Sequence, residues 1–321
     1  MDQKRTSRLM GILSILLVTC MFTVTGCSES NADPGQTSPP DGGKTQTSPE
    51  QELPSAETPA SIREAGLDLD SEFAGITGCA VLYSPDDELY SFYNEELCKK
   101  QVSPLSTFKI VSALMGLHAG VLENETTKME YNGTVYPISG WNKNVTLKEA
   151  FSTSCIWYFR QVIDQVGKEE VKAQLDQLSY GNCDIGQWQG NGANPLPELN
   201  GFWLNSTLKI SPLEQVKVLS DIFEGRSGYT SEEITILKNI MLVSEENEGA
   251  VCGKTGSGPG KAWFVGFYEK DSARNYVAVY LEDEDKKDSI SGENAKNIAL
   301  EIINETFHAP AAAIDTSRVG K

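Results

Sequence analysis

The chain has 321 residues and a formal net charge of −18, and 39% of its residues are hydrophobic. This length and apolar content are enough for one large domain or two small ones with a real core. The acidity argues against a nucleic-acid partner, which needs clustered Lys and Arg, and against attachment to anionic lipid by charge alone. The chain holds only two histidines, His118 and His308, and none of its seven cysteines forms a C-x-x-C pair. We therefore expect neither a metal site nor a redox dithiol, and there are few ways to build a Ser-His-Asp triad.

Residues 1–27 have the layout of a bacterial lipoprotein signal peptide. Three basic residues within the first eight precede an apolar run over residues 9–24, and small residues then lead to Cys27. Cleavage there would leave Cys27 as a lipid-modified N-terminus. The run is short for a spanning helix and contains threonines and a glycine, which disfavours a transmembrane anchor. We predict a secreted protein that this lipid alone attaches to the outer face of the bacterial cell membrane.

The composition then divides the chain into a linker, a domain and a tail. Residues 28–63 are rich in Ser, Pro, Thr and Glu and have almost no large apolar side chain. Such a segment cannot bury enough surface to offset the entropy of ordering it, so we predict a flexible spacer. Residues 309–321 are predicted to be a loose tail, which leaves residues 64–308 as the folded domain.

Strands are predicted at both ends of this domain and helices between them. Short apolar runs bounded by turn residues predict the strands, and helical spacing of apolar residues predicts the helices. The predicted strands are Cys79–Tyr83, Leu89–Tyr93, Val251–Gly256, Ala262–Glu269 and Tyr276–Leu281. The predicted helices are Ser106–Ala119, Leu147–Val166 with a break near residues 152–154, Lys168–Leu178, Pro212–Phe223, Ser231–Met241 and Asn294–Phe307. This order predicts an α/β (α+β) fold: an antiparallel sheet built from both ends and flanked by helices, with an inserted all-helical subdomain.

A serine and a lysine stand three residues apart where the first long helix is predicted to begin. At this spacing the Lys109 amine can reach the Ser106 hydroxyl, and a helix N-terminus favours a developing alkoxide. With so few histidines, a lysine is the obvious base for a nucleophilic serine. One S-x-x-K match is weak evidence, because Ser206 and Lys209 also fit it.

Two further segments make the pattern specific. Lys254-Thr255-Gly256 occurs once and lies on a predicted strand, and Ser154 lies at the predicted helix break. S-x-x-K, an intervening serine element and K-T-G, in this order, are the signature of penicillin-recognising serine enzymes.

On these residues the sequence resembles class D β-lactamases over about residues 75–308. The matching strings run in family order: Ser103-Pro104-Leu105-Ser106-Thr107-Phe108-Lys109, Ser154-Cys155-Ile156, Tyr180-Gly181-Asn182, Phe202-Trp203-Leu204, Lys254-Thr255-Gly256 and Ala262-Trp263-Phe264-Val265-Gly266. The resemblance implies the β-lactamase/transpeptidase-like fold, with the site between a sheet domain and an all-helical domain. It also implies a serine β-lactamase that hydrolyses penicillin-type antibiotics and confers resistance to them.

The resemblance assigns roles to the motif residues. Ser106 would be acylated, and Ser154 would relay a proton. Lys109 would be N-carboxylated by CO2 or bicarbonate and act as general base for both acylation and deacylation; no other cofactor is implied. The K-T-G strand would bind substrate: Lys254 by its charge, Thr255 by its hydroxyl, and Gly256 and Ser257 as its continuation. The backbone N–H groups of Ser106 and Ser257 would form the oxyanion hole.

Carboxylation of Lys109 requires a neutral amine. A free lysine has a pKa of ~10.4, and lowering it to ~7 takes roughly 4–5 kcal/mol of preference for the neutral form. Desolvation in an apolar pocket has this effect. We expect Phe108, Ile156, Trp203 and Leu204 around the amine, and the resemblance implies that the Trp203 indole N–H binds the carbamate.

Several residues fall outside this scheme. The family often has an arginine before the last helix to hold the substrate carboxylate, whereas residues 289–300 contain only Lys296 as a cation, so the β-lactam spectrum stays open. We expect His118 and Trp263 to be structural and the acidic residues 282–288 to form a solvated loop. Cys79 and Cys98 are candidates for a disulfide across the first hairpin. With five cysteines besides those of the signal, at least one should be free.

Two other functions fit the same motifs. The first is a β-lactam sensor, which is acylated and not turned over; such sensors often have a polar residue where this chain has Ile156. An apolar residue there favours turnover, because a polar one would solvate the amine and keep it protonated. The second is a D-Ala-D-Ala transpeptidase or carboxypeptidase acting on peptidoglycan stem peptides, although those enzymes usually show S-x-N.

Overall fold

The computed structural model describes residues 63–246, 249–283, 285 and 290–308. The predicted signal peptide with Cys27, the predicted linker up to residue 62, the predicted tail at 309–321 and most of the acidic segment 284–288 lie outside the described residues. In the described ranges, no helix is both long enough and apolar enough to cross a membrane.

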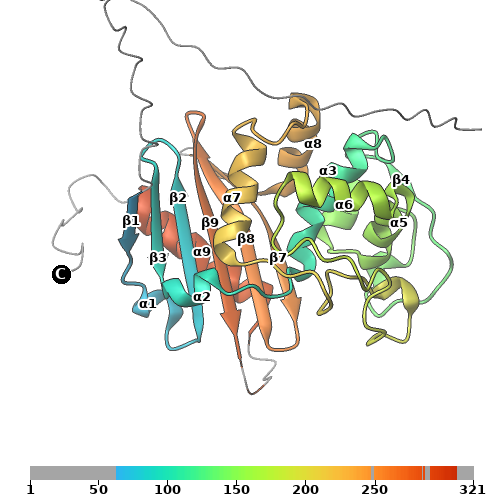
Figure 1. The fold of residues 1–321 in the computed structure, drawn as a ribbon, viewed down its shortest axis with the longest axis horizontal. Coiled ribbons are helices and arrows are strands. Elements are labelled where there is room, and N and C mark those ends of the chain that lie inside the picture. Colours follow the sequence, from blue (N-terminus) through green and yellow to red (C-terminus); the bar gives the residue numbers. More distant parts are fainter. Residues whose placement is uncertain (1–62, 247–248, 284, 286–289, 309–321) are drawn as a thin grey trace, which may run out of the picture. The chain divides into compact units, whose positions relative to one another are not determined.

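Within these ranges, a sheet of seven strands is the scaffold of the domain (Figure 1). Its strand order is β1-β3-β2-β9-β8-β7-β6, so strands from the beginning and the end of the domain meet where β2 pairs with β9. This confirms the predicted sheet assembled from both ends. The strands are β1 (Arg63–Gly66), β2 (Gly78–Ser84), β3 (Leu89–Tyr93), β6 (Leu242–Glu246), β7 (Gly249–Gly258), β8 (Lys261–Lys270) and β9 (Ala273–Glu282).

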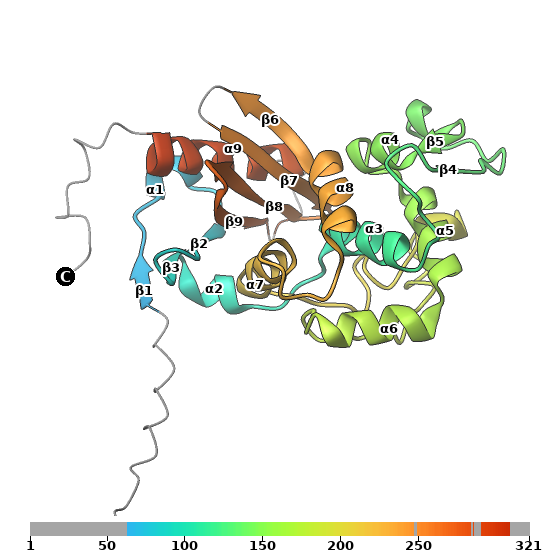
Figure 2. The same cartoon turned by 90° about the horizontal axis from the view of Figure 1, so that it is seen from above.

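The helices cover both faces of this sheet and form the inserted region beside β7 (Figure 2). Helix α9 packs on one face, and α2 and α7 pack on the other, while α3 to α6 and α8 form the helical part. The α-helices are α1 (Asp70–Phe73), α2 (Glu95–Lys99), α3 (Lys109–His118), α4 (Leu147–Ser152), α5 (Ile156–Val166), α6 (Lys168–Gln177), α7 (Pro212–Phe223), α8 (Ser231–Met241) and α9 (Gly292–Ile303). A short pair, β4 (Lys128–Met129) and β5 (Val145–Thr146), lies within the helical part.

The central strands are buried on both faces because each face has its own core. On β2, Cys79 and Val81 belong to the large core shared with the helical part, whereas Ala80 and Leu82 belong to a second core with α9. Successive side chains of a strand point to opposite faces, so a continuous apolar run suits such a strand. The burial of β7 and β8 between two cores gives the K-T-G strand a rigid base.

The edges of the sheet differ from the prediction. Arg63, assigned to the linker, begins β1, and β1 runs parallel to β3, so the sheet is antiparallel except at this edge. β1 is mostly exposed and joins the sheet through backbone hydrogen bonds, which leave no apolar pattern in the sequence. Strand β6 follows α8 without a loop, and its exposed Leu242 and Val243 lack the alternation that predicts a strand.

The proposed Cys79–Cys98 disulfide is wrong for this structure. All five described cysteines are free thiols, and both members of the predicted pair are buried. The Cys98 thiol donates a hydrogen bond to the Ala80 carbonyl, 3.2 Å away. Burial, followed by the Cys98 thiol, raises the pKa of Cys79 well above its ordinary value. Both cysteines are therefore core residues, and Cys79 favours its neutral thiol form.

Candidate active site

Ser106 lies in a 3₁₀ turn, η1 (Leu105–Phe108), that leads directly into α3. The long helix predicted from Ser106 therefore begins with a tighter turn, and Lys109 is the first α-helical residue. Leu105 has a φ of +53°, in the left-handed region that bulky residues rarely adopt. Its N–H donates to the Trp203 carbonyl over 3.1 Å, which helps to hold this strained residue in place.

Buried contacts hold the serine loop, by which we mean Ser103–Leu105 just before the nucleophile Ser106. The Ser103 hydroxyl donates to the Trp203 carbonyl at 2.8 Å, and the Trp263 indole N–H donates to the Ser103 carbonyl at 3.0 Å. Trp263 is fully buried on β8. As expected, Trp263 has a structural role: it ties the serine loop to the sheet.

The Lys109 amine is fully buried and lies 2.8 Å from the Ser106 hydroxyl oxygen. Burial, and secondarily the positive charge of Lys254, lowers the pKa of Lys109 well below its ordinary value. The amine lies 5.6 Å from the centre of the Phe159 ring. An amine desolvated in this way favours its neutral form, which carboxylation of Lys109 requires.

The second S-x-x-K match does not form such a pair. Ser206 lies in a loop and donates its hydroxyl to the Gln187 side chain at 2.7 Å. Lys209 is partly exposed, and among the described residues no hydrogen bond joins it to Ser206. Only the first tetrapeptide is placed at a helix start, where its two side chains meet.

Ser154 is presented by a strained turn between α4 and α5. Its φ is +58°, and its N–H donates to the Phe151 carbonyl while that of Cys155 donates to the Ala150 carbonyl. This is a Schellman motif, in which glycine usually takes the left-handed position. A serine there accepts about 1–2 kcal/mol of backbone strain in exchange for a hydroxyl at the helix break.

Lys254 of β7 connects Ser154 to the K-T-G strand. Its amine donates to the Ser154 hydroxyl oxygen at 2.8 Å and to the Thr255 carbonyl at 3.0 Å. The side chain is 5% exposed, and burial lowers the pKa of Lys254 to about 8. Near neutral pH this lysine still carries most of its charge.

Strand β7 packs directly against the serine loop. A Cβ built on Gly256 would lie 3.3 Å from the Pro104 carbonyl oxygen and 3.4 Å from the Ser106 backbone nitrogen. A side chain at this position would crowd the nucleophile, which explains the glycine. The two Ser–Lys pairs, Ser106 with Lys109 and Ser154 with Lys254, therefore meet across one narrow interface between the sheet and the helical part.

The N-terminus of α9 lies against the same strand. The Gly292 N–H donates to the Ser257 hydroxyl oxygen at 2.8 Å, and a Cβ on Gly292 would come within 2.8 Å of the Thr255 Cβ. A cavity of about 240 Å³ opens there. Its apolar lining comes from α4, α8, β6, β7 and β8, and its charged or polar lining residues are Ser152, Lys254, Thr255, Glu293 and Lys296. Lys296 therefore shares a cavity with the K-T-G strand, but its amine is paired with Glu293 at 2.7 Å.

The four residues expected around the Lys109 amine belong to the large apolar core or pack against it. Phe108, the preceding residue, stacks on Trp203 with ring centres 5.3 Å apart, and both are buried. Ile156 and Leu204 are partly buried and pack against the same core. The Trp203 indole N–H is buried and has no hydrogen-bond acceptor among the described residues. A buried donor without an acceptor is costly, and its presence here suits an anionic group held near Lys109.

Sequence reasoning missed a cluster behind Trp203. Arg160 of α5 is 3% exposed, is paired with Asp164, and lies over the rings of Trp188 and Trp203. The only signal in the sequence was the i,i+4 spacing of Arg160 and Asp164, which usually marks an exposed helix pair. Only Arg160 of this pair is buried, and the tryptophan that lies nearest to it belongs to a loop more than 20 residues away in the chain.

His118 lies at the far end of α3, as expected of a structural residue. Its ring nitrogen is 3.1 Å from the Glu233 carboxylate, and its ring meets Tyr229 edge-on.

Tyr180 is fully buried, and its hydroxyl lies 3.5 Å from the Gln215 side chain, which in turn donates to the Thr107 hydroxyl at 2.7 Å. Tyr180 therefore supports Thr107, the residue after the nucleophile, through the Gln215 side chain.

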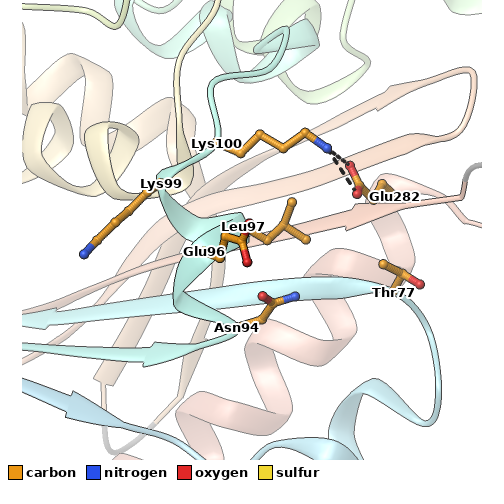
Figure 3. A pocket seen from close by; sticks show the side chains of 7 residues that line it. All are labelled: Thr77, Asn94, Glu96, Leu97, Lys99, Lys100 and Glu282. Carbon is orange, nitrogen blue, oxygen red and sulfur yellow. Dashed lines mark hydrogen bonds and ion pairs between the residues drawn. The ribbon is translucent and has the colours of Figure 1, made fainter.

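A separate cavity of about 390 Å³ lies beside α2 and contains none of the motif residues (Figure 3). In it, Lys100 is paired with Glu282 at 3.2 Å, and Lys99 points away from the other lining side chains. The residues that line it are Thr77, Asn94, Glu96, Leu97, Lys99, Lys100 and Glu282. It holds no nucleophile, so the chemistry belongs to the interface of η1, β7 and the α4–α5 break.

Comparison with known proteins agrees with this geometry. The family model of the penicillin-binding protein transpeptidase domain matches residues 78–304. The regulatory protein BlaR1 of Staphylococcus aureus is 33% identical over 244 residues; the match covers 74% of this chain but 39% of BlaR1. The crystal structure of a class D β-lactamase from Bacillus subtilis superposes with a TM-score of 0.66 at 30% identity and covers 74% of this chain and 95% of that one. The C-terminal domain of the Bacillus licheniformis BlaR penicillin-receptor gives a TM-score of 0.69 at 28% identity, covering 78% and 99%.

The left-handed backbone at Ser154 predicts a difference between two variants. Ser154→Gly and Ser154→Ala both lose the hydrogen bond to Lys254, but only the glycine relieves the strain. We expect S154G to be more stable than S154A by about 1 kcal/mol, or about 2–4 °C in melting temperature for a domain of this size. Thermal unfolding followed by circular dichroism measures this. Equal melting temperatures would show that the turn relaxes when the hydroxyl is removed.

Proposed function

The chain belongs to the penicillin-recognising family of transpeptidase-like domains, among the class D β-lactamases and the BlaR receptor domain, and we propose that it is a serine β-lactamase acting on penicillin-type antibiotics. One observation carries this proposal: a fully buried lysine amine lies 2.8 Å from a partly exposed serine hydroxyl. That pair supplies both a nucleophile and a site for its base.

The chain's own residues account for ring opening. The Ser106 oxygen attacks the β-lactam carbonyl, its proton passes to the base at Lys109, and the developing oxyanion accepts hydrogen bonds from the N–H groups of Ser106 and Ser257. The amide C–N bond then breaks, and the leaving nitrogen takes a proton from the Ser154 hydroxyl. Lys254, 2.8 Å from that hydroxyl, replaces the proton. The product is an acyl-enzyme on Ser106.

The residues around Lys109 fit a CO2-derived carbamate. Burial lowers the pKa of the Lys109 amine and so favours the neutral form that reaction with CO2 requires, and the buried Trp203 N–H lacks an acceptor among the described residues. When bound, the group supplies a carboxylate-like base beside Ser106. Phe108, Ile156, Trp203 and Leu204 would exclude water from it and keep the amine from protonating.

Turnover separates this proposal from its nearest alternative. Hydrolysis of the acyl-enzyme needs a base that persists after acylation, and the apolar Ile156 at the start of α5 favours one. The likeness to the BlaR penicillin-receptor domain supports the alternative of a receptor that stays acylated. A D-Ala-D-Ala transpeptidase or carboxypeptidase remains an outcome of the test.

Two further statements extend the proposal to the whole protein. The N-terminal sequence supports cleavage before Cys27 and a lipid on that cysteine, which would place the domain at the outer face of the cell membrane. There it would meet β-lactams before they reach the enzymes of the cell wall and would confer resistance to them.

Counting product per protein tests the proposal. We expect a large excess of a chromogenic penicillin-type substrate in bicarbonate buffer to yield many equivalents of opened ring, and we expect Ser106→Ala to yield none. Removal of bicarbonate should lower the rate, and its return should restore it, because the carbamate forms reversibly.

Other outcomes of this count would replace the proposal. A burst of one equivalent that then stops would make the protein a receptor. Release of D-alanine from a stem-peptide mimic without β-lactam turnover would make it a carboxypeptidase. A turnover rate that does not depend on bicarbonate would support the β-lactamase activity and contradict the carbamate on Lys109.

The pKa of Lys254 predicts an alkaline limb in the pH profile. Burial lowers this pKa to about 8, so the charge that attracts the substrate carboxylate is present below pH 8 and is lost above it. We expect kcat/KM for an anionic penicillin to fall about tenfold per pH unit well above pH 8. Lys254→Arg, whose guanidinium stays charged, should lose this limb even if its rate is lower. An unchanged limb in K254R would assign the titration to another group.

The ion pair on α9 predicts opposite effects of two substitutions. Lys296 shares the cavity with Lys254 and Thr255, and Glu293 offsets its charge. We expect Lys296→Met to raise KM for an anionic penicillin about two- to fivefold and Glu293→Gln to lower it, with kcat nearly unchanged, because partly exposed charges contribute about 1 kcal/mol or less. Both shifts should shrink in high salt. Shifts of the same sign would show that the pair acts through the fold of α9.

A further inference from the structure

Arg160 is a buried cation that the catalytic scheme does not use. It lies on α5, one helical turn after Ile156, and its side chain is 4% exposed. Its Nε donates to an Asp164 carboxylate oxygen at 2.8 Å, a second nitrogen pairs with the other oxygen, and a third donates to the Trp188 carbonyl at 2.6 Å. The Trp188 indole N–H also donates to Asp164, at 3.0 Å.

The Arg160 guanidinium lies over two tryptophan rings. Its central carbon is 5.1 Å from the ring centre of Trp188 and 5.9 Å from that of Trp203. Phe202 joins the two rings, because it stacks on Trp188 at 5.1 Å and meets Trp203 edge-on at 5.1 Å. Trp203 is thus held by Arg160, by Phe202 and by the stacked ring of Phe108.

Packing alone does not explain an arginine here. Removing a guanidinium from water costs several kcal/mol, and the Asp164 side chain that pairs with it is 44% exposed, so this ion pair offsets only part of that cost. The planar fork of Arg160 can bind a carboxylate, a carbonyl and a ring face at the same time, which fixes its own orientation. A group fixed in this way can fix the ring that it contacts.

We propose that Arg160 is a positioning residue that orients the Trp203 indole and so sets how tightly Lys109 retains CO2. An indole in an apolar pocket can turn about its side-chain bonds, and its N–H supports a carbamate only from one orientation. A cation over the ring also draws electron density from the indole and strengthens its N–H as a donor. This inference rests on the carbamate of the proposed function, and the described contacts of Arg160 include neither Ser106 nor Lys109.

The test measures CO2 on Lys109 directly. Purified protein is titrated with ¹³C-bicarbonate at fixed pH, and the carbamate carbon is followed by ¹³C NMR. For Arg160→Met we expect half-saturation at a bicarbonate concentration about tenfold higher than for the unaltered protein. Arg160→Lys, which keeps the charge without the planar fork, should lie between the two.

The chain offers a closely matched control in Arg274. It is also paired with a carboxylate, Glu269, donates to the Phe223 carbonyl at 3.0 Å, and lies over the rings of Phe223 and Phe267 at 5.8 and 5.9 Å. Arg274→Met therefore removes the same kinds of contact away from Trp203. We expect it to lower the melting temperature and to leave the bicarbonate titration unchanged.

The outcomes separate this inference from the proposed function. If the unaltered protein shows the carbamate signal and turns over substrate, but R160M titrates like it, the positioning role is overturned and the β-lactamase stands. An equal shift in R274M would overturn it as well, because loss of stability would then explain both. If R160M does not fold, R160K decides: an unchanged half-saturation point overturns the proposal. Absence of the signal in the unaltered protein overturns both the carbamate and this role.

Discussion

The burial of the Lys109 amine is the constraint on which the site depends. A charged ammonium group cannot be removed from water without a large cost, so burial of this lysine amine next to a serine lowers its pKa and favours the neutral form. The sheet and the helical part must then close around it without an acidic partner. The tryptophan and phenylalanine rings, the tie from Trp263 to Ser103 and the close approach of Gly256 to the Ser106 nitrogen all serve that closure.

Two lysines in one site perform different tasks because their burial differs. Lys254 reaches the Ser154 hydroxyl and keeps a pKa of about 8, so it remains largely a cation near neutral pH. The pKa of Lys109 is lowered further by complete burial and then by the charge of Lys254. Environments that push the pKa values of neighbouring groups apart define which one is the acid and which one is the base. Here the cation on β7 helps to keep the amine on α3 neutral.

The sequence predicted the central strands and the long helices because their apolar patterns match their burial on one or two faces. It also predicted which serine and lysine meet: the spacing of three residues fitted two pairs, and the K-T-G and Ser154 motifs decided for Ser106 and Lys109. It missed β1, which is mostly exposed and pairs with β3 through backbone hydrogen bonds, and it suggested a Cys79–Cys98 bond where the structure has two buried thiols. The Arg160 cluster escaped notice because its two tryptophans, Trp188 and Trp203, are distant in the chain.

Backbone strain beside Ser106 and at Ser154 lowers the stability of the domain. Leu105, just before the nucleophile, and Ser154, at the helix break, both have φ above +50°, where a glycine would be easier to accommodate. Glycine at 154 would remove the hydroxyl that Lys254 binds, and glycine at 105 would remove a buried apolar side chain and loosen the loop. Non-glycine residues at both positions hold the two hydroxyls in fixed places before substrate arrives. Because the surrounding core enforces this geometry, the reacting groups need little rearrangement when the β-lactam ring opens.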